Sequence, residues 1–229
     1  MIAIVDYGMG NLRSVEKALE HVGGKALVTS DPAQVEGADK VIVPGVGAFD
    51  QAIRELRTRR LWDPLQGFVR AGKPFLGVCL GFQLLFESSE EGQGAEGLGV
   101  FRGRVRRFRF EGRGTKDVGR RTWDVGRKAR DQRPATSDQR LKIPHMGWNT
   151  VTYKKGRCPL FKGVPDDSFF YFVHSYYADC TDRGVVAGET EYGVGFASAL
   201  WGGAVFGTQF HPEKSQAVGL QLLKNFVEL

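Results

Sequence analysis

Cys79 lies between two glycines in the segment "GVCLG", residues 77–81, where a thiol could act as a nucleophile. The segment reproduces, with cysteine in place of serine, the G-x-S-x-G turn at which a strand ends and a helix begins. The thiol would then lie at the N-terminus of a helix over 80–87, where the helix dipole and the free N–H groups favour a thiolate. The N–H of Leu80 could also bind an oxyanion. A free cysteine can equally be a packing residue, but this context favours the nucleophile.

His211 is the histidine best placed to act as a general base for such a thiol. It directly follows the strand-like segment "AVFGTQF" and precedes Pro212 and Glu213. Residues i and i+2 of an extended segment point to the same side, and the proline between them favours that conformation, so Glu213 can lie beside the imidazole. The carboxylate would orient the ring. Cys79, His211 and Glu213 therefore form a candidate catalytic triad.

A second glycine-rich turn, "PGVGAF" at residues 44–49, also follows a strand-like segment. It could be a plain connection to a helix capped by Asp50, or its backbone N–H groups could face the cysteine and line an oxyanion hole. The turn lacks the Lys and Ser/Thr of a phosphate-binding P-loop, so nucleotide binding is not expected.

The elements that position these residues follow from short, continuous apolar segments. Such segments are typical of parallel strands buried on both faces, and we predict them at 2–6, 26–30, 40–45 and 73–79. Helical patterns lie between most of them, one capped by Asn11 and another by Asp63. This alternation predicts a doubly wound α/β layer, mostly parallel, with helices on both faces. Its active residues would lie at the carboxyl ends of the strands.

The second half of the chain is rich in aromatic and β-branched residues after about Glu87 and ends in an amphipathic helix from about Ser215. We expect one domain, 1–229, in which residues 111–140 form a flexible basic surface insertion. That segment has few apolar residues and many Gly, Arg and Asp, so it can bury little surface.

The net charge of +6 belongs to one segment of the chain. Between Arg102 and Arg140 there are 14 Lys or Arg against 5 Asp or Glu. Aromatic interleaving and a folded nucleic-acid reader are both missing, so no nucleic-acid partner is expected. No apolar run approaches the roughly 18 residues that a membrane span requires, and the N-terminus lacks a signal peptide, so we expect a cytoplasmic protein without a membrane partner.

Three cysteines without a CxxC pair suggest neither a zinc site nor a disulfide framework. We expect Cys158 and Cys180 to be packing residues and expect no metal or cofactor.

Six motifs together make the chain resemble the class I, triad-type glutamine amidotransferases, and within that family the glutaminase subunits of imidazole glycerol phosphate synthase. The resemblance covers the chain except the basic segment, and in family order the motifs are "DYGMGNLRSVEKAL", "PGVGAF", "GVCLGFQLLFESSEEG", "PHMGWN", "FVHSY" and "GTQFHPEKS". It implies the family's flavodoxin-like α/β fold with a β-rich second half. Two departures are Phe82, where the family often has methionine, and the length of the basic segment.

The resemblance also implies a reaction and a partner. Cys79 would attack the side-chain amide of glutamine, release ammonia and leave a γ-glutamyl thioester that water hydrolyses to glutamate. A (β/α)₈-barrel cyclase subunit would receive the ammonia and form imidazole glycerol phosphate and aminoimidazole carboxamide ribonucleotide in histidine biosynthesis.

Further residues acquire roles by the same similarity. The implied oxyanion hole combines Leu80 with Val46 and Gly47, and the peptide at Val46 must turn inward for full activity. The implied substrate-binding residues are Gln83, Glu91, His174, Ser175 and Tyr176, and the implied residues of the cyclase interface are Trp148, Tyr171 and Lys214.

Three alternatives remain. A free-standing γ-glutamyl cysteine hydrolase would use the same triad but would not need "PHMGWN". A glutaminase of another synthase, such as the pyridoxal phosphate or anthranilate systems, is disfavoured by "DYGMGN" together with "PGVGAF". A non-catalytic binding module would lack a member of the triad.

Overall fold

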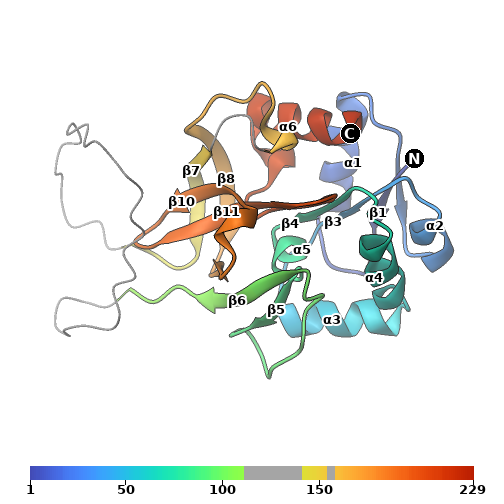
Figure 1. Ribbon diagram of the computed structural model, residues 1–229, viewed down its shortest axis with the longest axis horizontal. Coiled ribbons are helices and arrows are strands. Elements are labelled where there is room, and N and C mark those ends of the chain that lie inside the picture. Colours follow the sequence, from blue (N-terminus) through green and yellow to red (C-terminus); the bar gives the residue numbers. More distant parts are fainter. Residues whose placement is uncertain (111–140, 154–157) are drawn as a thin grey trace.

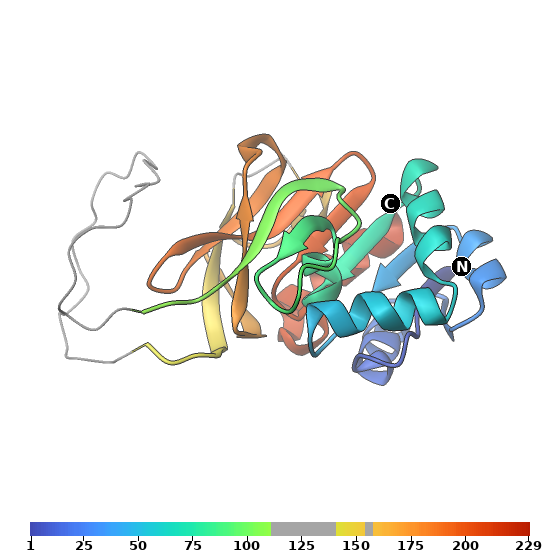
Figure 2. The ribbon, with the colours of Figure 1, turned by 90° about the horizontal axis from the view of Figure 1, so that it is seen from below.

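The computed structural model describes residues 1–110, 141–153 and 158–229, so the predicted basic insertion at 111–140 lies outside the described residues. The described residues form an α/β layer continued by antiparallel strands (Figure 1). In a view turned by 90° the strands of the second half still lie beside the α/β layer, not over it (Figure 2). The two parts share one hydrogen-bonded sheet.

The first half contains the four parallel strands that the sequence predicts. They are β1 (Ile2–Val5), β2 (Ala26–Thr29), β3 (Lys40–Val43) and β4 (Phe75–Val78), in the order β2-β1-β3-β4. A late strand, β12 (Val205–Thr208), pairs in parallel with the free side of β4. The carboxyl ends of β4 and β12 are therefore neighbours, although the two strands are far apart in the chain.

Helices cover both faces of this parallel sheet, as predicted. The apolar sides of α1 (Leu12–His21) and α6 (Gln216–Glu228) pack into one core cluster. Those of α2 (Pro32–Glu36), α3 (Phe49–Thr58) and α4 (Trp62–Arg70) pack into another. These two clusters bury the sheet from both sides and hold its strand ends in fixed positions.

The second half is rich in antiparallel strands. Its elements are β5 (Phe86–Ser89), β6 (Phe101–Arg107), β7 (His145–Tyr153), β8 (Ser168–His174), β9 (Tyr176–Cys180), β10 (Val186–Glu191) and β11 (Gly195–Gly202), with 3₁₀ helices η1 (Pro159–Phe161), η2 (Arg183–Val185) and η3 (Pro212–Lys214). The sheet continues from β12 through β11, β10 and β7 to β8, while β9 pairs with β11 and β6. Strands β7 and β8 form a hairpin-like antiparallel pair in which Trp148 lies opposite Tyr171.

Three local predictions about helices are wrong. The helix after Cys79, α5 (Leu80–Gln83), ends well before residue 87 because the apolar residues that follow are buried as the chain enters β5. Helix α4 begins at Trp62, so Asp63 lies inside its first turn and does not cap it. Asp50 likewise lies in the first turn of α3, where its carboxylate accepts the N–H of Gln93 instead.

Candidate active site

Cys79 occupies a strained turn between β4 and α5. Its backbone has φ 55° and ψ −105°, a region that non-glycine residues rarely adopt. A Cβ on Gly77 would lie 2.5 Å from the carbonyl oxygen of Gly81, and a Cβ on Gly81 would lie 1.8 Å from that of Val43. Both positions therefore require glycine, and the sharp turn predicted from "GVCLG" is present.

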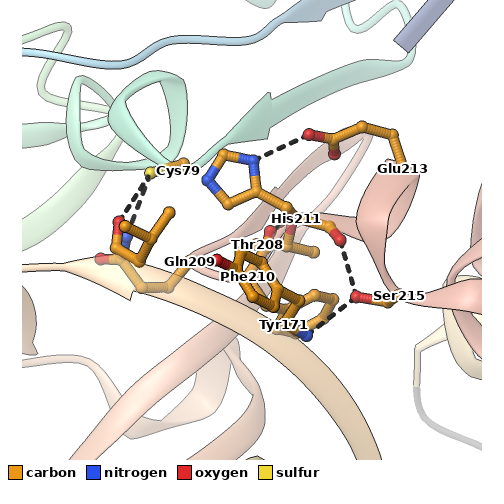
Figure 3. Close-up of polar contacts among 9 residues, drawn as sticks. Cys79, Tyr171, Thr208, Gln209, Phe210, His211, Glu213 and Ser215 are labelled. Atoms are coloured by element: carbon orange, nitrogen blue, oxygen red, sulfur yellow. Dashed lines mark hydrogen bonds and ion pairs between the residues drawn. The ribbon is translucent and has the colours of Figure 1, made fainter. Parts of the chain in front are cut away.

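His211 and Glu213 meet as a buried pair beside this turn. The Nδ1 of His211 lies 2.8 Å from Oε1 of Glu213, and the two side chains are 4% and 2% exposed. A carboxylate can only accept, so Nδ1 carries the proton and Nε2 is left as an acceptor. Among the described residues Nε2 has no hydrogen-bond partner, and the ring lies between Glu213 and Cys79 (Figure 3). This arrangement suits the transfer of the thiol proton to His211.

The electrostatics of the site favour that transfer. Burial by itself lowers the pKa of His211, but the neighbouring Cys79 and the carboxylate of Glu213, which accepts from Nδ1, outweigh it and raise the pKa. An imidazolium is therefore stabilised between a thiolate and a carboxylate.

The turn that carries the pair is anchored to β8. The N–H of His211 donates to the carbonyl of Tyr171 at 2.9 Å. The N–H of Tyr171 donates to Oγ of Ser215 at 3.0 Å, and that hydroxyl donates to the carbonyl of His211 at 2.6 Å (Figure 3). The expectation of an extended segment through Glu213 is wrong, because Pro212 begins the 3₁₀ helix η3. The predicted contact between His211 and Glu213 nevertheless forms.

A cavity of about 300 Å³ opens at Cys79. Its volume is at the lower end of the range for small-molecule sites. All the predicted oxyanion and substrate-binding residues line it, and the full lining consists of Val46, Gly47, Cys79, Leu80, Gln83, Glu91, Pro144, Val173, His174, Ser175 and Tyr176. The structure thus brings together the residues that the motifs single out for glutamine.

The predicted oxyanion hole is closed by a backbone hydrogen bond in this conformation. The N–H of Leu80 donates to the carbonyl of Gly45 at 3.3 Å, so this predicted donor is already engaged. Val46, the next residue, is exposed. The carbonyl of Gly45 would have to rotate away before Leu80 could bind an oxyanion.

Two predicted substrate-binding side chains also build the wall of the cavity. His174 Nδ1 donates to the carbonyl of Tyr176 at 2.7 Å, and its Nε2 lies 2.9 Å from Nδ1 of His145. Burial lowers the pKa of His174 to about 3, so the ring is neutral and both its nitrogens are used. Gln83 Nε2 donates to the same carbonyl at 3.2 Å and to Oε1 of Gln209 at 3.0 Å, leaving the Gln83 carbonyl oxygen for a ligand.

Glu91 is the acidic residue of the cavity wall. One of its carboxylate oxygens accepts the N–H of Phe49 at 3.0 Å, at the start of α3. Burial raises the pKa of Glu91, and the hydrogen bond from Phe49 opposes the shift.

Sequence reasoning assigned no role to Gln209 or His145. Gln209 is fully buried and its Nε2 lies 3.8 Å from Sγ of Cys79. Its position two residues before His211, on the same side of the chain end, was the signal available in the sequence. His145 lies between His174 and Asn149 and is within hydrogen-bond distance of both.

The three predicted interface residues lie together outside the cavity. The rings of Trp148 and Tyr171 are 6.1 Å apart in an edge-to-face arrangement, and Lys214 Nζ lies 5.9 Å from the centre of the Tyr171 ring. Trp148 is 46% exposed and the nearby Met146 is 62% exposed. Together these residues form an aromatic and basic patch that touches the catalytic turn through Tyr171.

The whole chain is similar to proteins of one known family. The family model of class-I glutamine amidotransferases matches residues 3–229. The chain belongs to this family. Curated relatives from Bacillus cereus and Syntrophotalea carbinolica are 46% and 45% identical, and each is named imidazole glycerol phosphate synthase subunit HisH. The alignments cover 99% and 100% of this chain and 93% and 100% of the relatives.

Solved structures agree in fold. A glutamine amidotransferase crystal structure superposes with a TM-score of 0.67 at 18% identity, with full coverage of both chains. The glutaminase domain of CTPS from Trypanosoma brucei gives 0.60 at 16% identity, with 99% of this chain and 93% of that chain covered. At these identities the likeness concerns the fold alone.

Within the described ranges, no group of three or more His, Cys, Asp or Glu side chains is arranged to hold a metal ion. None of the helices in these ranges has the length and apolar character of a membrane span.

Proposed function

We propose that the chain is the glutaminase subunit of imidazole glycerol phosphate synthase and that Cys79, His211 and Glu213 hydrolyse glutamine. The observation that carries the proposal is the convergence of the elbow cysteine and the buried His211–Glu213 pair, with Cys79 opening on the small cavity. Relatives of that name, about 45% identical over essentially the whole chain, support the choice of synthase.

The geometry supports a thioester mechanism. His211 Nε2 takes the proton of Cys79, and the thiolate attacks the side-chain amide carbon of glutamine. The oxyanion that forms is stabilised by the N–H of Leu80 and by the backbone at Val46 and Gly47. When the C–N bond breaks, His211 returns the proton to the leaving nitrogen and ammonia departs. His211 then activates a water that hydrolyses the thioester and releases glutamate.

Substrate recognition follows from the cavity wall. Glu91 is the carboxylate among the lining residues and suits the α-ammonium group of glutamine. The free carbonyl oxygen of Gln83 and the backbone at Ser175 and Tyr176 complete the proposed site. His174 contributes by holding the carbonyl of Tyr176 and not through a free ring nitrogen.

The partner is a (β/α)₈-barrel cyclase subunit that binds at Trp148, Tyr171 and Lys214. Tyr171 belongs to this patch and is also hydrogen-bonded to His211 and Ser215, so docking there can change the catalytic turn. Ammonia released into water at neutral pH would mostly protonate and lose its nucleophilicity, which favours direct transfer to the cyclase. The three free, buried cysteines suit a reducing cytoplasm, where we place the reaction.

A free-standing γ-glutamyl hydrolase should work at full rate alone. The engagement of the Leu80 N–H by Gly45 instead favours an enzyme that needs a partner to complete its oxyanion hole.

The test measures glutamate release by the purified chain alone and after mixing with a matching cyclase and its nucleotide ligand. We expect the mixture to be much faster, Cys79→Ala to be inactive, and Glu213→Gln to keep a residual rate because it orients His211 without attacking. An unstimulated mixture would reject the synthase assignment. Full turnover by Cys79→Ala would reject the triad.

A further inference from the structure

Gln209 is a buried amide at the sulfur of Cys79 that the triad does not use. It directly follows β12, is fully buried, and places Nε2 3.8 Å from Sγ (Figure 3). Its backbone N–H donates to the carbonyl of Ser198 at 2.8 Å, which fixes its main chain. Either end of its side-chain amide could in principle face the sulfur.

A backbone carbonyl decides between the two ends through a chain of hydrogen bonds. The carbonyl of Tyr176 can only accept, so the end of Gln83 that lies 3.2 Å from it must be the NH₂ group. The second hydrogen of that NH₂ group points to Gln209 at 3.0 Å, where only the carbonyl oxygen of Gln209 can receive it. The NH₂ end of Gln209 is therefore directed to Cys79.

Besides His211, the sulfur has a backbone acceptor in Val173 and a side-chain donor in Gln209. The carbonyl of Val173, 3.9 Å away, can accept the S–H of the thiol but offers nothing to a thiolate. The N–H of Gln209 has the opposite preference, because it can only donate. Hydrogen bonds to an ionised acceptor are shorter and stronger than those to a neutral one, so the bond from Gln209 gains strength when the proton leaves.

We propose that Gln209 is a fourth catalytic residue, whose side-chain N–H holds and stabilises the Cys79 thiolate, and that Gln83 fixes its orientation. The inference rests on the proposed role of Cys79 as nucleophile. It differs from the triad in mechanism, since Gln209 exchanges no proton.

The test follows alkylation of the isolated chain by iodoacetamide across pH, because the thiolate is the reacting form. Gln209→Glu keeps the shape and can still accept from Gln83, but it turns a carboxylate oxygen toward the sulfur. We expect the midpoint of the pH profile to rise by at least one pH unit, which is a tenfold increase in the proton affinity of the sulfur. Gln209→Met removes the donor without adding charge, and its rate should fall by roughly three- to tenfold.

Matched controls separate this effect from others. Gln51→Glu makes the same chemical change on the exposed side of α3 and should leave the profile unchanged. Cys79→Ser should abolish labelling, because burial raises the pKa of both Cys158 and Cys180 to about 11. Thermal unfolding confirms that each variant is folded.

An unchanged pH profile in a folded Gln209→Met or Gln209→Glu chain would overturn the inference. The assay requires neither glutamine nor a cyclase, so it can fail while glutaminase activity holds. Conversely, a shifted profile in a chain that the cyclase does not stimulate would retain this inference and reject the synthase assignment.

Discussion

Ser215→Ala tests whether the catalytic turn depends on its anchor at β8. The Ser215 side chain is fully buried and bridges two backbone groups, accepting the N–H of Tyr171 at 3.0 Å and donating to the carbonyl of His211 at 2.6 Å. Alanine fits the space but can do neither. The carbonyl of His211 would keep the N–H of Lys214 at 3.1 Å, whereas the N–H of Tyr171 would lose its partner.

The expected magnitude follows mainly from the N–H of Tyr171, which would lose its partner. A buried polar group without a partner costs roughly 1–3 kcal/mol. The Tyr171 N–H is only partly buried, so water can relieve some of its cost. We therefore expect Ser215→Ala to lower the free energy of unfolding by about 1–3 kcal/mol, and the loosened His211 to lower the turnover of glutamine as well.

Urea unfolding followed by tryptophan fluorescence measures the loss in free energy of unfolding. The matched control is Ser168→Ala, whose hydroxyl donates to the carbonyl of Pro165 at an exposed site and whose loss should cost less than about 0.5 kcal/mol. A loss below about 1 kcal/mol for Ser215→Ala, with an unchanged urea dependence and undiminished glutamate release, would refute the anchoring role.

Further predictions concern packing, a buried hydroxyl and pH. Gly81→Ala should lower the free energy of unfolding by more than about 3 kcal/mol or prevent folding, because its Cβ would lie 1.8 Å from a carbonyl of β3. The control Gly67→Ala in α4 meets nothing within 4 Å and should be neutral or stabilising. Urea unfolding of the two variants compares the effects. Tyr7→Phe should leave the melting temperature unchanged or raise it, because the buried Tyr7 hydroxyl has no partner among the described residues. A marked fall in melting temperature would contradict this expectation. Burial lowers the pKa of His145 to about 4 and that of His174 to about 3. Below about pH 6.5 the unfolded chain therefore binds more protons than the folded chain, and the folded state should lose stability as pH drops. The loss should reach up to roughly 1.4 kcal/mol per pH unit for each ring. A flat stability between pH 6.5 and 4.5 in urea titrations would count against neutral buried rings.

Local chemistry explains why much of the active site could be predicted. The elbow at Cys79 depends on glycines two positions away on either side, and the contact of His211 with Glu213 depends on a spacing of two residues. Such features are decided by backbone sterics over a few residues, and the structure contains both. The four parallel strands were predictable for a similar reason, since a strand buried on both faces must be continuously apolar.

Helix boundaries were less predictable, because tertiary contacts compete with capping preferences. Asp50 and Asp63 are good capping residues in isolation, yet α3 begins at Phe49 and α4 at Trp62, so each aspartate is already inside its helix. Asp50 binds the backbone of Gln93 from a distant loop instead. That contact cannot be read from the residues around Asp50.

The sequence by itself determined the candidate nucleophile, its candidate base and the order of strands and helices along the chain, because each depends on residue types at short spacing. The tertiary structure alone decided that β12 pairs with β4, which brings His211 to Cys79 across most of the chain. It also decided that Gly45 engages Leu80 and that Tyr176, through Gln83, turns the amide of Gln209 toward the sulfur. These contacts join strand ends that only the assembled sheet makes neighbours, and their hydrogen-bond directions depend on groups that no local pattern contains.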